Sequence, residues 1–262
     1  MSQNPTSNPK SEEKTHFGFD EVSLSEKTQK VLGVFHSVAQ KYDLMNDLMS
    51  GGMHRLWKTQ FVKMLDMRPG MSVLDMAGGT GDIAFKIYEA TKHFNDKVKI
   101  TICDINQSML NVGQDRAIDR GILSGLNFSC ADAAVLGFED ESFDRYTISF
   151  GIRNVTEIEK ALAEAYRVLK PGGRFQCMEF SKVSIPLLKK AYKSYSFKLI
   201  PWVGEKVTGD RESYQYLVES IEQFPSQEDF KSMIEYQLQH HRYLEVDQLR
   251  YIQYLHSSNN RG

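Results

Sequence analysis

Residues 73–84, VLDMAGGTGDIA, are the part of the chain best suited to holding a ligand. The apolar residues at its start predict a strand that delivers Asp75 to a glycine-rich turn, and this turn opens a helix that begins near Asp82. Glycine lacks a Cβ and tolerates positive φ, so the backbone N–H groups of such a turn can approach a ligand closely. The turn contains Gly78, Gly79 and Gly81. The pattern therefore predicts a loop that binds a nucleoside cofactor.

The charges beside this loop favour one cofactor over another. Residues 79–84 also fit the dinucleotide pattern G-x-G-x-x-A, which leaves NAD open as an alternative. A pyrophosphate favours a helix N-terminus free of anions, whereas Asp75 and Asp82 lie on either side of the glycines. S-adenosylmethionine carries an ammonium and a sulfonium and has no phosphate. We therefore expect S-adenosylmethionine at this acid-flanked loop, with Asp75 among the residues that bind it.

Two further acids follow the next two predicted strands. Asp104 ends the alternating strand at residues 98–103, where a carboxylate can accept both hydrogen bonds from a ribose diol. Asp104 or Asn106 could instead cap the next helix; beside a glycine loop, the ribose role is favoured for Asp104, and the capping role passes to Asn106. A third strand, residues 126–130, ends shortly before Asp132. Asp132 could reach the exocyclic amine of adenine, and a plain turn is the alternative there.

A polar segment follows the fourth predicted strand, residues 143–150. Residues 149–154, SFGIRN, are expected beside the transferable methyl group. Arg153 is our leading candidate for catalysis, because a guanidinium stays charged and is a good partner for an anionic substrate oxygen. The alternative is an arginine paired with a surface acid. Ser149 and Asn154 could equally satisfy buried backbone groups.

Alternating strands and helices position these residues. Thr156 and Glu159 form a capping-box pattern before an amphipathic helix, and Pro171 is expected to end that helix. A fifth strand is predicted at residues 174–180. This order predicts the α/β class with a doubly wound, mostly parallel sheet. Ligands of such sheets bind beyond the carboxyl ends of the strands, which would bring the acids and Arg153 around one crevice.

Composition limits the classes of protein to which the chain can belong. With 262 residues and 41% hydrophobic content, it can bury a full core as one catalytic domain. Its 32 basic and 34 acidic residues give a net charge of -2, so nucleic acid is not an expected partner. Its 3 cysteines lack metal-ligand spacing, and no metal site is expected. No apolar run approaches the roughly 20 residues that span a bilayer, so membrane contact would be peripheral.

A segment before the first predicted strand is rich in methionine and polar aromatics. Residues 42–57, YDLMNDLMSGGMHRLW, place Tyr42, His54 and Trp57 where a second wall of the site could form. Core packing would explain the methionines equally well. His54 could accept a proton, although a single histidine is more often structural.

These residues carry a resemblance to a known family. Residues 42–57 and 167–181 are similar to the two signatures of the ubiquinone/menaquinone biosynthesis C-methyltransferases, and the similarity runs from about residue 15 to residue 235. The chain resembles most the mitochondrial, eukaryotic branch. The resemblance implies the class I S-adenosylmethionine-dependent methyltransferase fold and two catalytic residues, Arg153 and Tyr42. It also implies that the cofactor contacts Thr80, Asp104, Asp132, Ala133 and Ser149, beside the glycine-loop residues Gly79 and Gly81.

The resemblance also implies a reaction and a setting. The reaction would be C-methylation of a polyprenylated methoxy-benzoquinol in ubiquinone biosynthesis, with Arg153 on the developing phenolate and Tyr42 in proton transfer. The setting would be the matrix side of the mitochondrial inner membrane, as a peripheral protein in a complex with other ubiquinone-biosynthesis proteins and as a possible homodimer. A catalytically impaired scaffold and a methyltransferase for another substrate class are the alternatives.

Five segments are expected along the chain. Residues 1–14 form a disordered arm without a visible presequence, and residues 15–66 form a cap of N-terminal helices. The methyltransferase domain covers residues 67–235, with a helical lid insertion after strand five at about residues 182–224. The basic and aromatic part of that insertion could rest on an anionic membrane, cover a prenyl tail or be an ordinary solvated helix. The tail, residues 236–262, departs from the family pattern.

The tail raises a question about the edge of the sheet. Family members usually end with a Gly-Phe turn and two closing strands, and no glycine occurs in the tail before Gly262. Residues 249–255 could supply one edge strand. Loss of a closing pair would expose a sheet edge and apolar surface, which puts the stability and activity of this chain in question.

Overall fold

The computed structural model describes residues 13–39, 44, 46–47, 50, 52–180, 195–240 and 250–253. Within them lies a parallel sheet of 6 strands in the order β5-β4-β3-β6-β7-β8. The strands are β3 (Ser72–Met76), β4 (Lys99–Asp104), β5 (Leu126–Cys130), β6 (Phe143–Ser149), β7 (Leu169–Glu179) and β8 (Arg250–Gln253). The strand order reverses between β3 and β6, so a crevice is expected at their carboxyl ends.

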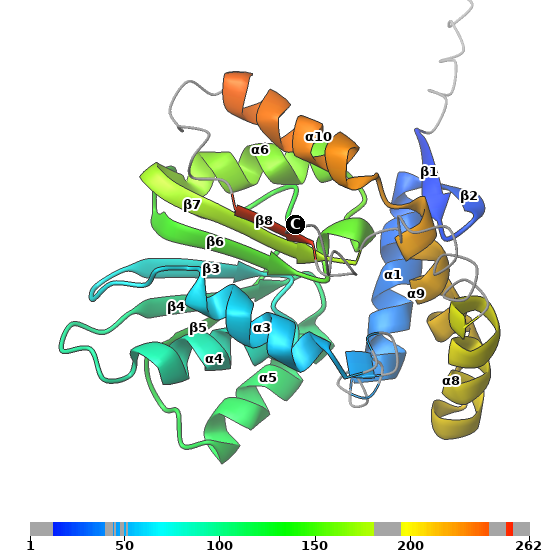
Figure 1. Cartoon of the computed structure of the whole chain (residues 1–262), viewed down its shortest axis with the longest axis horizontal. Helices are drawn as coiled ribbons and strands as arrows, with labels where there is room; N and C mark the ends of the chain where they lie inside the picture. The colour runs from blue at the N-terminus through cyan, green and yellow to red at the C-terminus, as the bar shows by residue number, and fades with distance from the viewer. Residues whose placement is uncertain are drawn as a thin grey trace, which may run out of the picture.

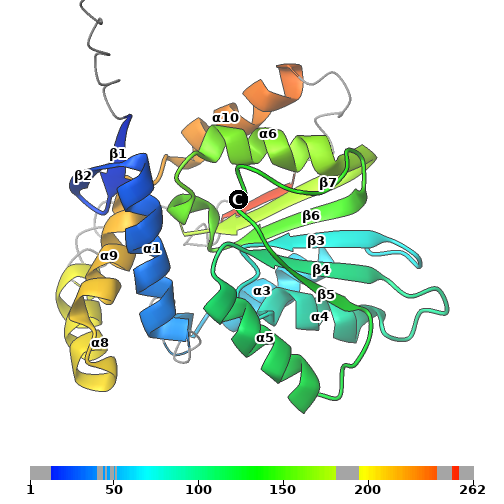
Figure 2. The same ribbon diagram turned by 180° about the vertical axis from the view of Figure 1, so that it is seen from behind.

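Helices cover both faces of this sheet, as Figures 1 and 2 show. One face carries α3 (His54–Lys63), α4 (Asp82–Thr91) and α5 (Gln107–Asp119), and the other carries α6 (Ile158–Val168) and α10 (Gln227–His240). Successive residues of β3 point to opposite faces: Val73 packs in the core with α4, and Leu74 packs in the core with α6. The predicted doubly wound sheet is confirmed.

A third group of elements lies beyond the carboxyl ends of the strands (Figure 1). Asn106, which follows β4, donates from Nδ2 to the Leu32 carbonyl of the cap at 3.3 Å. The group consists of the hairpin β1 (Lys14–Phe17) and β2 (Asp20–Ser23), α1 (Leu24–Val38), η3 (Tyr195–Leu199), α8 (Ile200–Thr208) and α9 (Arg211–Gln223). The cap thus combines N-terminal elements with elements of the predicted lid insertion.

The boundaries of α6 differ from those expected. The capping box is wrong: Glu157 is the N-cap residue and makes no side-chain cap bond. The Thr156 hydroxyl instead lies 2.9 Å from the hydroxyl of Thr28 on α1. The helix also ends before Pro171, because β7 begins at Leu169, which pairs with Phe143 of β6. Both differences arise from tertiary contacts that a local pattern does not contain.

The tail contributes to the sheet. β8 pairs in parallel with β7, with Gln176 opposite Arg250 and Glu179 opposite Gln253, so the predicted edge strand is present. The tail predicted from residue 236 begins inside α10. Among the helices in the described parts of the chain, none is both long and apolar enough to cross a bilayer.

Candidate active site

A first cavity opens where the carboxyl ends of β3, β4 and β6 meet the cap. Four of the predicted site residues line it: Gly79, Asp104, Asp132 and Ala133. The roof comes from α1, with Thr28, Val31, Leu32 and Phe35, which the sequence reasoning did not assign to the site. The signal that could have found them is the apolar face of that helix. Asp75, Thr80, Gly81 and Ser149 do not line the cavity, and Tyr42 lies outside the described residues.

Asp104 fastens the glycine loop to the end of β4. Its Oδ2 accepts from the Gly79 N–H at 2.9 Å, and its Oδ1 accepts from the Asn106 N–H at 2.8 Å. Burial raises the pKa of this carboxyl to about 6. Asn106 caps α5 by accepting from the Ser108 and Met109 N–H groups, as expected. The Asp104 carboxylate is thereby held on the cavity wall in one orientation.

The glycine loop leaves no room for larger residues. Gly79 has a φ of 53°, and a Cβ there would lie 3.0 Å from Cε of Met109, another wall residue. Gly81 has a φ of 85° and is the N-cap residue of α4, where a Cβ would lie 2.9 Å from the ring of Phe85. The left-handed backbone and the close neighbours both require glycine at these positions.

Asp132 makes a turn and also lines the cavity. Its Oδ1 accepts from the Ala134 N–H at 2.9 Å, so the turn that the sequence left as an alternative is present. The carboxylate is nevertheless on the wall, next to Ala133.

Asp75 lies beneath the loop. It is 1% exposed, and the Thr147 hydroxyl donates to its Oδ1 at 2.8 Å. Burial raises its pKa to about 7, and the charges of Asp82 and Asp104 act in the same direction. Its Oδ2 and the buried Ser149 hydroxyl both have no hydrogen-bond partner in the part of the chain that the structure describes. Unpartnered acceptors and clustered acids around one loop favour a cation.

A pH prediction follows from the raised pKa of Asp75. Because its folded-state pKa lies above the ordinary value, Asp75 contributes most to stability below about pH 4, and this contribution is lost as pH rises through about 7. For this fully buried group, the difference between the two pKa values corresponds to roughly 4 kcal/mol of unfolding free energy. Asp75→Asn should lack this decline. Urea unfolding of both proteins without ligand, at pH 4.5 and 7.5, measures the difference, and parallel pH profiles would contradict it.

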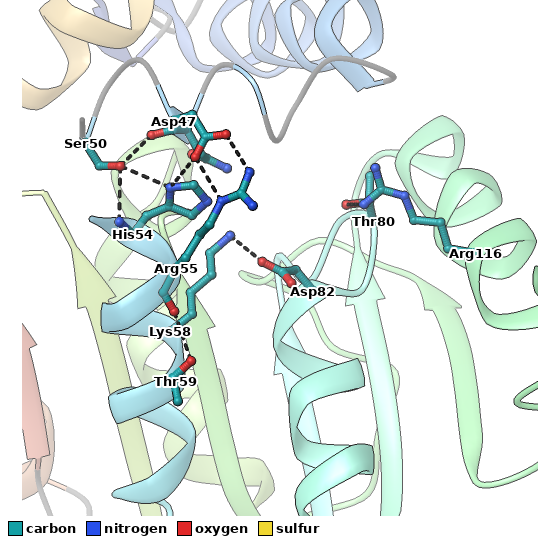
Figure 3. A network of polar contacts seen from close by, with 10 residues as sticks. Asp47, Ser50, His54, Arg55, Lys58, Thr59, Thr80, Asp82 and Arg116 are labelled. Atoms are coloured by element: carbon teal, nitrogen blue, oxygen red, sulfur yellow. Dashed lines mark hydrogen bonds and ion pairs between the residues drawn. The ribbon is translucent and has the colours of Figure 1, made fainter. Parts of the chain in front are cut away.

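A network of polar contacts joins α3 to the glycine loop (Figure 3). Lys58 donates to Asp82 Oδ2 at 2.6 Å, with its side chain 4% exposed. Burial opposes ionisation of Asp82, but Lys58 holds the pKa of this carboxyl below its usual value. On the far side of the loop, Arg116 donates to the Thr80 hydroxyl at 3.0 Å. The loop is therefore held from both sides.

His54 and Trp57 do not line the first cavity, although the sequence predicted that residues 42–57 could form its second wall. His54 is 2% exposed and hydrogen-bonds through Nδ1 with the Ser50 hydroxyl at 3.0 Å. Burial lowers its pKa, so its neutral form is favoured. Trp57 packs edge-on against Phe180, with the ring centroids 6.3 Å apart. Both residues belong to the support behind the site.

Lys58→Met should destabilise the protein by about 1–3 kcal/mol, because Asp82 would keep its charge without a partner. The expected loss of stability is smaller than for a fully buried ion pair, because the Asp82 side chain is 31% exposed. Urea unfolding measures the change, and Lys63→Met, at an exposed position of the same helix, is the control. Equal stability of the two variants would contradict this role.

Arg153 lies in a buried ion pair. Its Nη1 donates to Glu179 Oε1 at 2.6 Å and to the Phe150 carbonyl at 2.7 Å, and its Nε donates to the Ser220 hydroxyl at 3.3 Å. Arg153 belongs to η2 (Ile152–Asn154) and lines a second cavity on the other side of this turn. The acid that pairs with Arg153 is therefore buried. The alternative drawn from the sequence was a pair with a surface acid. Burial raises the pKa of Glu179, and Arg153 opposes this rise.

Glu179, the partner of Arg153, is a further residue that the sequence reasoning missed. It ends β7 and is 0% exposed. An acid directly after residues 175–178, which carry no charge, was the available signal. Within the described residues, no cluster of three or more histidine, cysteine or acidic side chains could hold a metal ion.

Comparisons with known proteins identify a family for this chain. The profile of the ubiE/COQ5 methyltransferase family matches residues 23–246. The ubiquinone/menaquinone biosynthesis C-methyltransferase UbiE of Brucella abortus is 58% identical over 221 residues, which cover 84% of this chain and 81% of that protein. The mitochondrial 2-methoxy-6-polyprenyl-1,4-benzoquinol methylase of Danio rerio is 51% identical over 251 residues, covering 84% of this chain and 77% of that protein.

A solved structure supports the fold independently. A protein of Methanococcus maripaludis, described as an S-adenosyl-L-methionine-dependent methyltransferase, has a TM-score of 0.52 at 13% identity and covers 77% of this chain and 83% of its own. At this identity the likeness concerns the fold alone. The family match and the two relatives establish more: this chain belongs to the ubiE/COQ5 methyltransferase family.

Proposed function

We propose that this methyltransferase transfers a methyl group from S-adenosylmethionine to a ring carbon of a polyprenylated methoxy-benzoquinol in ubiquinone biosynthesis. The observation that carries the cofactor assignment is the charge of the first cavity. Asp104 and Asp132 line it, and no lysine, arginine or histidine is among the described residues on its wall. A cavity with acids and without bases suits a cationic cofactor and disfavours a pyrophosphate.

The residues present fit the cofactor. Asp104 is positioned to accept from the ribose hydroxyls, and Asp132 with Ala133 to receive the adenine. Gly79 allows close approach, because a Cβ at that position would crowd the wall. Asp75 lies beneath the loop, and within the loop the Thr80 hydroxyl accepts from Arg116. When bound, S-adenosylmethionine supplies a methyl group that is already activated for transfer.

The substrate assignment rests on the two relatives named above: one is named a C-methyltransferase of ubiquinone/menaquinone biosynthesis, and the other a 2-methoxy-6-polyprenyl-1,4-benzoquinol methylase. A benzoquinol is electron-rich, and a negative charge developing on its ring oxygen increases the nucleophilicity of the ring carbon. Arg153 is the proposed partner of that oxygen. Glu179 fixes its guanidinium, and Nη2 has no acceptor among the described residues. Tyr42 is the proposed proton-transfer residue. Holding both reactants at near-attack distance would supply much of the rate.

The position of Arg153 adds a requirement to this proposal. Arg153 lines the second cavity, whereas the next residue of η2, Asn154, lines the first cavity. A substrate oxygen would therefore have to reach past this turn. Arg153→Lys and Arg153→Met test the assignment: turnover should fall while affinity for S-adenosylhomocysteine is kept. Unchanged turnover would remove Arg153 from the reaction.

The cofactor and substrate class are tested with the purified chain. Titration with S-adenosylhomocysteine and NADH should give saturable binding of the first alone. Isotope-labelled methyl groups should then enter a short-chain 2-methoxy-6-prenyl-benzoquinol, kept reduced, and not RNA or a protein mixture. Binding of NADH, or label in the other acceptors, would overturn the corresponding part of the proposal.

The location belongs to the same proposal. The relative from Danio rerio is mitochondrial, which supports a mitochondrial location for this chain. A prenylated substrate resides in a bilayer, so we place the protein peripherally on the matrix side of the inner membrane, with other ubiquinone-biosynthesis proteins and as a homodimer. Phe19, Leu199 and Trp202 are 50%, 43% and 51% exposed on the cap and are suited to that contact. Cosedimentation with vesicles would test it.

A further inference from the structure

The second cavity differs from the first in its charge. It has a volume of about 150 Å³ and lies between the N-terminal hairpin, α1, η2 and α9. Lys27, Arg153 and His16 line it, together with polar residues that include Thr15 and Gln223. In the described part of the chain, no carboxylate lies on its wall. The first cavity has acids and no bases, and this one has bases and no acids.

Lys27 is a buried cation on the wall of this cavity. The residue is 7% exposed, and its Nζ donates to the Val155 carbonyl at 3.2 Å. An ammonium has three N–H donors, and no other described residue accepts from this one. Burial lowers the pKa of this ammonium. A buried ammonium without a counter-charge is costly, so an anion would be bound favourably there.

Two acids that contact residues around the cavity are already engaged. Glu179 pairs with Arg153 at 2.6 Å and leaves Lys27 as the cation without a carboxylate partner among the described residues. Glu219 on α9 accepts from the Phe19 N–H at 3.2 Å and does not line the cavity.

The size and the opening of the cavity suit a small tetrahedral anion. About 150 Å³ is several times the roughly 30 Å³ share of one water molecule. His16 is exposed and Thr15 is half-buried, so the cavity communicates with solvent along the hairpin. We propose that this cavity binds a phosphate group, held by the ammonium of Lys27.

The phosphate group could come from solution or from a lipid headgroup. Gly18 lines the cavity. The next residue, Phe19, is half exposed and stacks on Phe197, with the ring centroids 6.0 Å apart. The exposed aromatic residue therefore follows a residue of the cavity wall. The site does not depend on methyl transfer, so its test needs neither cofactor nor quinol.

The test uses the full chain and two kinds of phosphate. Inorganic phosphate is titrated at constant ionic strength, with NaCl in exchange, and followed by calorimetry and thermal unfolding. Lys27→Met should weaken phosphate binding at least about tenfold, because it removes a hydrogen bond between charged groups. Lys27→Met should also unfold at a higher temperature without phosphate, since a buried charge is replaced by a thioether of similar length. Lys30→Met, one turn along α1, is the control and should bind as the wild type does.

The second arm uses vesicles of phosphatidylcholine with and without phosphatidylglycerol. Weaker cosedimentation of Lys27→Met than of Lys30→Met would assign the site to lipid phosphate, and equal cosedimentation with loss of inorganic phosphate binding would assign it to free phosphate. Wild-type-like phosphate binding by Lys27→Met, or no saturable binding by the wild type, would overturn the proposal.

Discussion

Asp104→Asn should weaken the binding of S-adenosylhomocysteine by about 10–100-fold, because hydrogen bonds to a charged acceptor contribute about 1.5–3 kcal/mol. The amide has nearly the shape of the carboxylate but no charge for the ribose hydroxyls. Burial raises the pKa of Asp104 to about 6, so wild-type affinity should fall as pH drops below that value, and the variant should not show this fall. Calorimetry between pH 5 and 8 measures both effects.

The variant also changes two contacts within the protein, since Asp104 accepts from the Gly79 and Asn106 N–H groups. Circular dichroism and thermal unfolding should therefore accompany the titration. Asp119→Asn, at an exposed position at the end of α5, is the matched control and should bind as the wild type does. Wild-type affinity in a folded Asp104→Asn protein would show that the carboxylate does not hold the cofactor.

Glu179→Ala should destabilise the protein by about 3–5 kcal/mol, since it leaves the guanidinium of Arg153 buried without its carboxylate. The side chains of Glu179 and Arg153 are 0% and 3% exposed, so water cannot replace the lost partner without rearrangement. The Phe180 N–H would also lose its acceptor, Glu179 Oε1, at 2.8 Å. Urea unfolding at pH 7.5 measures the change.

A double variant separates charge from packing. Glu179→Leu combined with Arg153→Met removes both charges and should recover most of the stability that Glu179→Ala loses. Glu159→Gln, at an exposed position on α6, should change stability little and is the control. A double variant no more stable than Glu179→Ala would indicate that lost packing, and not an unpaired charge, causes the destabilisation.

The strands and the cofactor loop could be predicted from the sequence because their signals are local. The third predicted strand, residues 126–130, matches β5, and Asn106 takes the helix cap expected of it. Glycines at 79 and 81 have the positive φ that the turn requires. Asp104 and Asp132 meet on one wall because parallel strands bring their carboxyl ends to the same edge.

The features that could not be predicted depend on contacts between residues that are distant in sequence. The Thr156 hydroxyl meets Thr28, which lies 128 positions earlier, instead of capping its own helix. Arg153 pairs with Glu179, 26 positions away, and the order of strands in the sheet decides that contact. The basic cavity around Lys27 joins three segments of the cap. A single sequence contains no local signal for such meetings.

The most direct measurement is the position of the transferred carbon. The purified chain is incubated with S-adenosylmethionine labelled with carbon-13 in the methyl group and with a reduced short-chain 2-methoxy-6-prenyl-benzoquinol, and the product is examined by NMR. We predict one labelled methyl group bonded to a ring carbon. A label on oxygen, or no product from a folded sample that binds S-adenosylhomocysteine, would contradict the proposed reaction.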